Sequence, residues 1–321
     1  MGDLAVDTAV EPVDGGVAHE SGPGDDLGDP GGGHGGRSGG PGGGGSRGGD
    51  EPGPPRRYAG RLSADWAIWG PNGGYVASLA LRAAGLATGR ARPASIVAHL
   101  LGVAAFDAVD LDVTVLRSSR FATSARVSLT QGGRPILEAL VWGVDPGGVA
   151  LAHDMAAGPD VLQPGELPTR DERIAGIPPD QRPPDMPFFR NVDQRALGWH
   201  DEWPPAGPEE PHGLWWFRFR PTPRFADPWV DACRSLIPVD TMGWPAASLA
   251  HAHVDPPQAI AVTVDLSVRF HRPADDEWLL VEAVSPVGAD GLVAATGRVW
   301  DRAGTLVASG GQTMLCRPAV R

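Results

Sequence analysis

The sequence contains no lysine, so all 27 of its basic residues are arginines, and they are outnumbered by 39 acidic residues. A net charge of -12 argues against nonspecific binding of nucleic acid. The only two cysteines, Cys233 and Cys316, lie within apolar patterns, which indicates reduced core thiols and a cytoplasmic protein rather than a disulfide or metal framework. No stretch is long and apolar enough to cross a bilayer, so we expect a soluble protein without a membrane partner.

Residues 1–57 differ in amino-acid composition from the remainder of the chain. It holds 20 of the 45 glycines, and it carries almost no large apolar side chains that could form a core. Such a composition cannot bury enough apolar surface to offset the entropy lost on ordering. We therefore expect residues 1–57 to form a disordered glycine-rich tail with no chemistry of its own.

The remaining chain predicts two similar units joined by a linker. A long alanine-rich helix and several strands with turn signals between them occupy 58–152, and a comparable order returns over 184–321. The proline-, aspartate- and glycine-rich stretch 153–183 indicates an extended linker. Helix followed by antiparallel strands is an α+β order, not the alternation of a parallel α/β fold.

The two units are an internal repeat. Ala77-Ser78-Leu79-Ala80 recurs as Ala247-Ser248-Leu249-Ala250, and the turn residue Gly133 recurs as Gly304. The same offset along the chain places Asp240 over Gly70 and Gln312 over Val141. The repeat therefore carries these polar groups only in its second copy, as a single working site would require.

Asp240 is the most informative of these polar residues. Asp227 and Pro228 predict the N-cap and first residue of a helix whose apolar stripe includes Leu236 and Ile237. Helical spacing places Asp240 on the same buried face, where the pattern calls for a hydrophobic residue. Either this carboxylate has a chemical task, or it caps the short apolar run 245–250.

Several motifs after residue 226 occur together in one known family. They are Asp240 with Pro245, Thr263 in VTVDLSVRFHRP, Glu277-Trp278-Leu279-Leu280, Ser285-Pro286, Gly297-Arg298, and LVASGGQ ending at Gln312. In the first unit, GGYVASLALRAA, AHLLGV and QGGRP match the same family more loosely. Through these motifs the chain resembles the double hotdog acyl-CoA thioesterases of the thioesterase II type. The resemblance implies two tandem helix-wrapped antiparallel sheets that form one continuous sheet.

The resemblance also implies a catalytic trio, consisting of Asp240, Thr263 and Gln312. In the family these residue types together hold a water, which the carboxylate activates for attack on the thioester of an acyl-CoA. No metal, cofactor or nucleophilic side chain is then needed. The strand pattern, however, places Thr263 on the more polar face of 260–270, so either a β-bulge turns it inward or that face is also covered.

Four further residues are candidates for contact with the acyl-CoA substrate. Gly310 and Gly311 interrupt a strand pattern, which indicates either close approach of the pantetheine arm or a bulge. Arg272 and Arg298 could bind the phosphates of CoA, although surface salt bridges explain arginines equally well.

Two other functions compete with hydrolysis. A noncatalytic acyl-CoA-binding protein would be expected to lose the trio, which is intact. A hotdog enoyl-CoA hydratase would require a histidine about five residues after the aspartate, where this chain has Pro245. The pair His251 and His253 does not indicate a metal site, because residues two apart on a helix point away from each other. The sequence leaves a homodimer open.

Overall fold

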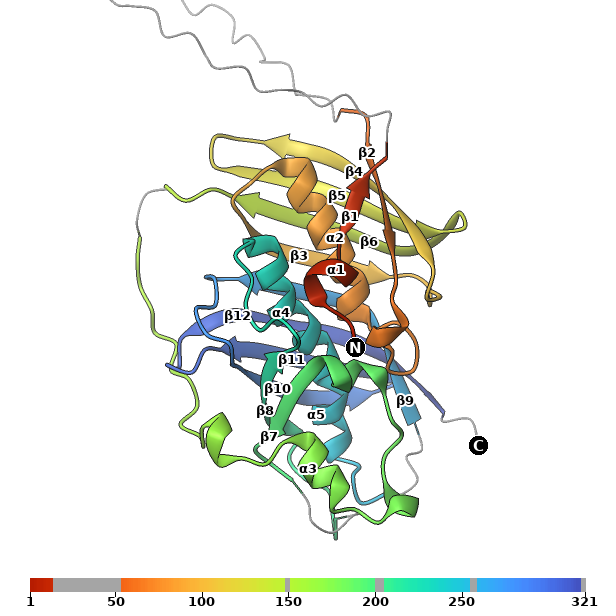
Figure 1. Cartoon of the computed structure of the whole chain (residues 1–321), viewed down its shortest axis with the longest axis vertical. Helices are drawn as coiled ribbons and strands as arrows, with labels where there is room; N and C mark the ends of the chain where they lie inside the picture. The colour runs from red at the N-terminus through yellow and green to blue at the C-terminus, as the bar shows by residue number, and fades with distance from the viewer. Residues whose placement is uncertain (14–52, 148–150, 200–204, 255–258, 319–321) are drawn as a thin grey trace, which may run out of the picture.

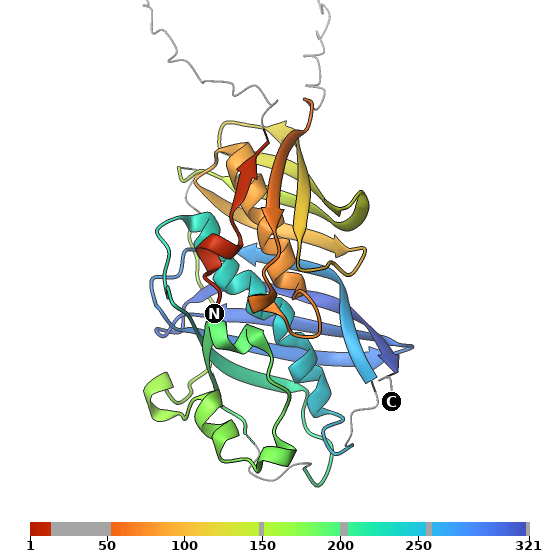
Figure 2. The same cartoon turned by 45° about the vertical axis from the view of Figure 1, so that its right-hand side comes forward.

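The computed structural model describes residues 1–13, 53–147, 151–199, 205–254 and 259–318. In these residues twelve strands form one antiparallel sheet in the order β1-β2-β4-β5-β6-β3-β9-β12-β11-β10-β8-β7. The sheet curls around the two long helices α2 and α4, which lie side by side on its inner face (Figures 1 and 2). The predicted α+β order and the single continuous sheet are confirmed.

The two halves of the sheet are built from the same order of elements. The first half contains β2 (Arg56–Arg61), α2 (Gly73–Thr88), β3 (Arg92–Leu100), β4 (Ala108–Ser118), β5 (Ala122–Gln131) and β6 (Arg134–Val144). The second contains β7 (Val192–Ala196), β8 (His212–Phe219), α4 (Pro228–Thr241), α5 (Gly243–Leu249), β9 (Ala259–Phe270), β10 (Leu279–Ala289), β11 (Leu292–Trp300) and β12 (Leu306–Pro318).

The halves meet where β3 pairs with β9 and where α2 crosses α4. In the sheet, Ile96 lies opposite Val268, and both side chains are buried against the helices. A Cβ atom on Gly74 would come within 2.8 Å of the Cα of Ile237, so only glycine allows the two helices to approach this closely. Because the core is continuous across this junction, each half covers apolar surface of the other.

The predicted repeat also holds in the pairing register of the strands. Val141 on β6 lies between Ile96 and Ala125, and Gln312 on β12 lies between the equivalent Leu266 and Ala295. Both halves also contain a register shift at equivalent positions. The shift passes over Ala94 in β3 and over Val264, its equivalent in the repeat, in β9. Each marks a β-bulge, where the bulged strand switches the face to which its side chains point.

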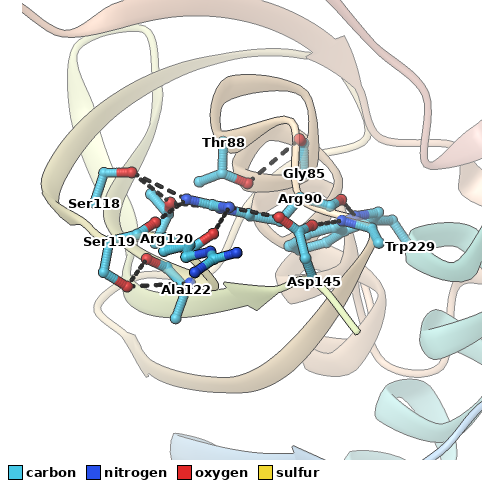
Figure 3. Close-up of polar contacts among 11 residues, drawn as sticks. Gly85, Thr88, Arg90, Ser118, Ser119, Arg120, Ala122, Asp145 and Trp229 are labelled. Atoms are coloured by element: carbon cyan, nitrogen blue, oxygen red, sulfur yellow. Dashed lines mark hydrogen bonds and ion pairs between the residues drawn. The ribbon is translucent and has the colours of Figure 1, made fainter. Parts of the chain in front are cut away.

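The C-terminal end of α2 is fixed by the side chain of Arg90 (Figure 3). Its guanidinium donates to the Thr123 hydroxyl over 2.8 Å and forms an ion pair with Asp145 at 2.5 Å. The Arg90 carbonyl in turn accepts a hydrogen bond of 2.8 Å from the indole of Trp229 at the start of α4. These bonds connect α2, the neighbouring hairpin and α4 at the end of the helices remote from Asp240.

The prediction of a disordered tail over 1–57 is wrong for residues 1–13 and for residues 56–57, which belong to β2. Residues 1–13 form helix α1 (Leu4–Asp7) and strand β1 (Val10–Pro12), and β1 pairs with β2 at the edge of the sheet (Figure 1). Leu4 and Val10 are buried in the main core, which provides the apolar burial that the composition of the whole segment obscured. The glycine-rich stretch 14–52 lies outside the described residues.

The prediction of an extended linker over 153–183 also requires correction. This segment contains the short helices η2 (Pro164–Glu166), α3 (Arg170–Ala175) and η3 (Pro179–Gln181). Part of it covers the outer face of the second half, where the indole of Trp216 donates to the Leu162 carbonyl over 2.9 Å. Leu167 completes a small apolar cluster with Trp216, Leu280 and Trp300.

Candidate active site

The carboxylate of Asp240 lies at the contact between the two halves. Asp240 occupies the last turn of α4 and is only 6% exposed. Its Oδ2 accepts a hydrogen bond of 2.8 Å from the backbone amide of Gly74 and one of 3.2 Å from the Asn72 side chain. Both donors belong to the N-terminus of α2. The suggestion that Asp240 caps the run 245–250 is wrong, because α5 begins after Met242 without a side-chain cap.

Thr263 points toward Asp240 because of the β-bulge at Val264. Without the bulge, Thr263 would share a face with Asp265, on the outside of the sheet. Across the bulge Thr263 instead lies opposite Met314, a buried residue on the same face as Gln312. The Thr263 hydroxyl lies 2.8 Å from Oδ1 of Asp240 and 2.8 Å from Oε1 of Gln312. Of the two explanations left open by the sequence, the bulge is the one the structure contains.

Gln312 closes the arrangement from β12. Its Nε2 donates a hydrogen bond of 2.6 Å to the backbone carbonyl of Asp240, which leaves Oε1 facing Thr263. Gly243 makes room for this amide, because a Cβ at that position would lie 1.9 Å from Nε2. The three side chains come from α4, β9 and β12, and they are joined by direct hydrogen bonds.

The surroundings of Asp240 make its carboxylate a stronger base than an exposed aspartate. Burial raises the pKa of Asp240 above the ordinary value of 3.8, and the hydrogen bonds from Thr263, Gly74 and Asn72 oppose that rise. The positive end of the α2 helix dipole also favours the ionised form. Burial thus disfavours the charged form of the carboxyl group, while three hydrogen-bond donors within reach favour it.

The Thr263 hydroxyl has two acceptors but only one proton. It donates either to Oδ1 of Asp240 or to Oε1 of Gln312, and not to both at once. One of these two oxygens can therefore accept a hydrogen bond from a further donor. An arrangement of this kind can hold a water or a hydroxyl group next to an ionised carboxylate.

Gly310 and Gly311 are required by the sheet itself. Both pair in regular register with β9 and β11, so the bulge suggested for this point is absent. A Cβ on Gly310 would lie 2.1 Å from the Ser267 carbonyl oxygen, and one on Gly311 would lie 2.6 Å from that of Ala295. Close approach of the neighbouring strands accounts for both glycines, and their contact with a substrate stays a prediction.

The two arginines predicted to bind phosphates are not brought to the trio. Arg272 follows the far end of β9, about 23 Å along the strand from Thr263, and it pairs with Asp154 at 2.8 Å. Arg298 lies on the outer face of the sheet, opposite to the face of Gln312, with Glu282 at 3.8 Å. In this structure both arginines form ion pairs at the surface.

Asn72 and Gly74 are the site residues that sequence reasoning missed. A signal was present, because an asparagine before a glycine pair that opens a helix is a typical N-cap, and Asn72 does accept from the amide of Tyr75 at 2.9 Å. The contact of this N-terminus with Asp240, which lies in the other half of the chain, has no local signal. Within the described ranges, no group of three histidine, cysteine or acidic side chains is placed to hold a metal ion.

Comparison with known proteins gives a consistent result. The acyl-CoA thioesterase N-terminal domain family matches residues 62–144, and the acyl-CoA thioesterase C-terminal domain family matches residues 167–316. A comparison with curated proteins finds no match. No helix in the described parts of the chain has the length and apolarity to cross a membrane.

Three solved structures illustrate the likeness of the fold. The acyl-CoA thioesterase II TesB2 from Mycobacterium marinum is 22% identical, with a TM-score of 0.64 over 82% of this chain and 93% of the other. The tesB protein of Mycobacterium avium subspecies paratuberculosis is 24% identical, with a TM-score of 0.63 over 82% and 93%. A protein of unknown function with a hotdog fold from Alicyclobacillus acidocaldarius is 18% identical, with a TM-score of 0.67 over 99% and 98%.

These likenesses confirm the predicted double hotdog fold. The two family matches together cover most of the chain, and they fall on its two halves in the expected order. The chain therefore belongs to the acyl-CoA thioesterase family and is a thioester hydrolase.

Proposed function

We propose that this protein hydrolyses acyl-CoA thioesters to the free acid and CoA, with water as the nucleophile and no cofactor. Asp240 orients the water and removes its proton, while Thr263 and Gln312 fix its position. The water oxygen forms a bond to the thioester carbonyl carbon, and the CoA sulfur leaves as the thiolate, which takes up a proton. An ionised carboxylate with a raised pKa suits the role of general base.

The observation that supports this proposal best is the position of the Thr263 hydroxyl, which lies 2.8 Å from Oδ1 of Asp240 and 2.8 Å from Oε1 of Gln312. A structural carboxylate would have all of its partners satisfied within the protein. Here the single proton of Thr263 leaves one acceptor oxygen open beside the buried carboxylate. The repeat adds support, because the residues of the first half that are equivalent to Thr263 and Gln312 in the strand register are Pro93 and Val141, whose side chains carry no hydroxyl or amide group.

Two alternatives lead to different outcomes in the test. A noncatalytic acyl-CoA-binding protein would bind the substrate without releasing a thiol. A hotdog enoyl-CoA hydratase would add water to a carbon–carbon double bond, and it is disfavoured because Pro245 stands where that chemistry would need a histidine. Neither alternative explains why the trio is intact.

The decisive experiment measures free thiol release from short, medium and long acyl-CoAs by the full chain and by Asp240→Asn. This substitution keeps the volume but removes the base, so turnover should fall by about 100-fold or more while acyl-CoA binding persists. Asp227→Asn is the matched control, because Asp227 caps the same helix and asparagine is an equally good cap. An Asp240→Asn protein with wild-type turnover would refute the assignment.

The remaining expectations form part of the same proposal. We place the reaction in the cytoplasm and in fatty acid metabolism, supported by the two free cysteines and by the thioester substrate. The division into two units, with the catalytic side chains on the second unit 184–321, is proposed from the restart of the pattern. Gly310, Gly311, Arg272 and Arg298 remain the candidates for contact with CoA.

A further inference from the structure

A cleft opens beside the N-terminal half of α4, at the end of the helix remote from Asp240. It encloses about 310 Å³, part of which is open to solvent, and this is the lower end of the range for small-molecule sites. Its walls are formed by α4, by the start of β3, by the end of β9 with the residues that follow, and by the start of β12. Its polar lining residues are Arg92, Asp231, Ser235 and Arg272, and the other lining residues are apolar.

The internal repeat relates this cleft to the site of the trio. Pro93 in its wall is equivalent to Thr263 in the strand register. Counted from the first residue of each helix, Gly85 of α2 takes the place of Asp240 of α4. The ring of Trp229 packs against this glycine, within 2.6 Å of the position that a Cβ atom would take (Figure 3). The cleft is therefore the counterpart of the trio site in the other half of the repeat, closed at its centre by an indole and without the trio.

The α4 wall of the cleft contains two buried oxygen atoms without partners. Ser235 is 2% exposed, and its hydroxyl forms no hydrogen bond with any of the described residues. Asp231 is 7% exposed, and its Oδ1 accepts a hydrogen bond of 2.8 Å from Arg234, whereas its Oδ2 has no partner within the described ranges. Residues four apart lie on the same face of a helix, so both groups face the cleft that they line. Since buried polar groups are nearly always hydrogen-bonded, these two atoms indicate a ligand.

Arg92 lies on the strand side of the cleft and is half-buried. Its Nη1 donates hydrogen bonds of 3.2 Å and 3.1 Å to the carbonyls of Pro93 and Phe270, which fixes the guanidinium at the cleft wall. Its Nε and Nη2 have no acceptor in the described parts of the chain, and a planar guanidinium suits a carboxylate. Burial and the positive charges of nearby arginines, Arg92 among them, lower the pKa of His271, which indicates a positive field here.

The charges that line the cleft leave one positive charge without a counterion. Asp231 forms an ion pair with Arg234 at 2.8 Å, and Arg272 forms one with Asp154 at 2.8 Å. Arg92 forms no ion pair with the residues that the structure describes. A bound molecule should therefore carry one negative charge, and it should also carry a hydrogen-bond donor for the free oxygen of Asp231.

We infer that this cleft binds a small hydroxy carboxylate, an organic acid with a hydroxyl group close to its carboxylate. The carboxylate of the ligand pairs with Arg92, which balances the surplus positive charge. The hydroxyl of the ligand donates to Oδ2 of Asp231 and accepts from the Ser235 hydroxyl, so that both buried oxygens gain a partner. The apolar walls cover the short carbon chain. Because Pro93 and Gly85 replace a hydroxyl and a carboxylate of the trio, the ligand is bound and not converted.

Other classes of small molecule match the lining less well. A simple fatty acid has no hydroxyl, so it would leave Asp231 and Ser235 without partners. A zwitterionic amino acid carries no net charge and would leave the charge of Arg92 unbalanced. A phosphate monoester carries up to two negative charges, which exceeds the single surplus charge and sets the excess near the Asp231 carboxylate.

Isothermal titration calorimetry of the full chain with 3-hydroxybutyrate and with butyrate tests this inference, because the two probes differ only in the hydroxyl group. 3-Hydroxybutyrate should bind to saturation at one molecule per chain, and butyrate should bind about 10-fold more weakly or worse, since it leaves two buried oxygens unpaired. Ser235→Ala should weaken 3-hydroxybutyrate about 5-fold and leave butyrate unchanged. Arg92→Gln should weaken both probes by a similar factor, about 10-fold or more, because it removes the charge that both carboxylates use.

Two control variants separate this cleft from the rest of the molecule. Arg302→Gln removes an exposed charge on a hairpin turn, and Asp240→Asn changes the trio, so both should bind 3-hydroxybutyrate as tightly as the wild type. Circular dichroism confirms that each variant is folded, and if Arg92→Gln fails to fold, the two probes with Ser235→Ala decide alone. No saturable binding of 3-hydroxybutyrate, equal affinity for the two probes, or binding weakened by Asp240→Asn and not by Ser235→Ala would each overturn the inference.

Discussion

The N-terminal segment offers the sharpest test of how this structure is stabilised. Leu4 is 1% exposed and packs in the main core, although it belongs to the short segment 1–13 that precedes the glycine-rich stretch. Nearby, the Asp7 carboxylate accepts a hydrogen bond of 3.0 Å from the Trp66 indole, and the Tyr75 hydroxyl donates to the Asp7 carbonyl over 2.8 Å. These contacts hold the loop before α2, which carries Asn72 to the carboxylate of Asp240.

The expected cost of Leu4→Ala follows from its burial. Removing a buried leucine side chain costs about 2–5 kcal/mol when the surroundings cannot collapse. The loss in free energy of unfolding cannot exceed the free energy with which residues 1–13 dock on the core. Once that limit is reached, these residues detach while the rest of the chain stays folded. At roughly 2 °C per kcal/mol for a chain of this size, the melting temperature should fall by about 4–10 °C.

Calorimetry with a matched control decides the question. Val6 lies in the same helix but is 71% exposed, so Val6→Ala should leave the melting temperature within about 1 °C of the wild type. Turnover of Leu4→Ala should also fall, since the loop that presents Asn72 loses support. Equal melting temperatures for Leu4→Ala and the wild type would show that residues 1–13 are not docked in solution.

Three other outcomes are expected. Asp240→Asn should unfold at a higher temperature than the wild type at pH 7. Because the pKa of Asp240 is raised in the folded protein, ionisation of this carboxyl lowers the stability of the wild type as pH rises from 3.8 toward the folded pKa. Below pH 3.8 the carboxyl is neutral in the folded and the unfolded wild type, so the difference in melting temperature should vanish. Asn72→Asp keeps the helix cap but places a second carboxylate beside Asp240, so the acid limb of the pH–kcat/KM profile should move to higher pH; an unchanged limb would exclude this contact. The fragment 184–321 should fail to melt cooperatively, because β9 loses its pairing with β3 and α4 loses its contact with α2; a soluble, cooperatively folded fragment would contradict this.

Much of the fold was predictable because its signals are local. The hairpin turns at Gly133 and Gly304 set the offset of the repeat, and that offset correctly paired Val141 with Gln312 in the register of the sheet. Leu4 and Val10 were missed for the opposite reason. Two buried residues are hidden when composition is averaged over the whole glycine-rich range 1–57, although a short segment needs only a few apolar contacts to dock.

Contacts between the halves could not be predicted from spacing alone. Asp240 was recognised as a carboxylate on a buried helix face, but its donors at Asn72 and Gly74 belong to a helix on the other half of the chain. Their meeting depends on how closely α2 approaches α4, and the absence of a side chain at Gly74 allows that close approach. Helical periodicity gives the face that a residue occupies, not the group that it meets there.

The position of Thr263 shows how a feature of the fold becomes a feature of the site. A bulge at Val264 directs the Thr263 hydroxyl to Asp240, but the first half has a bulge at the equivalent Ala94, where the corresponding residue is Pro93 and no hydroxyl is present. The bulge therefore does not depend on the chemistry, and it recurs because both strands bend at the same point as the sheet curls around its helix. A strict alternation of faces places Thr263 outside, and the equivalent register shifts of the two halves explain why that alternation fails at this residue.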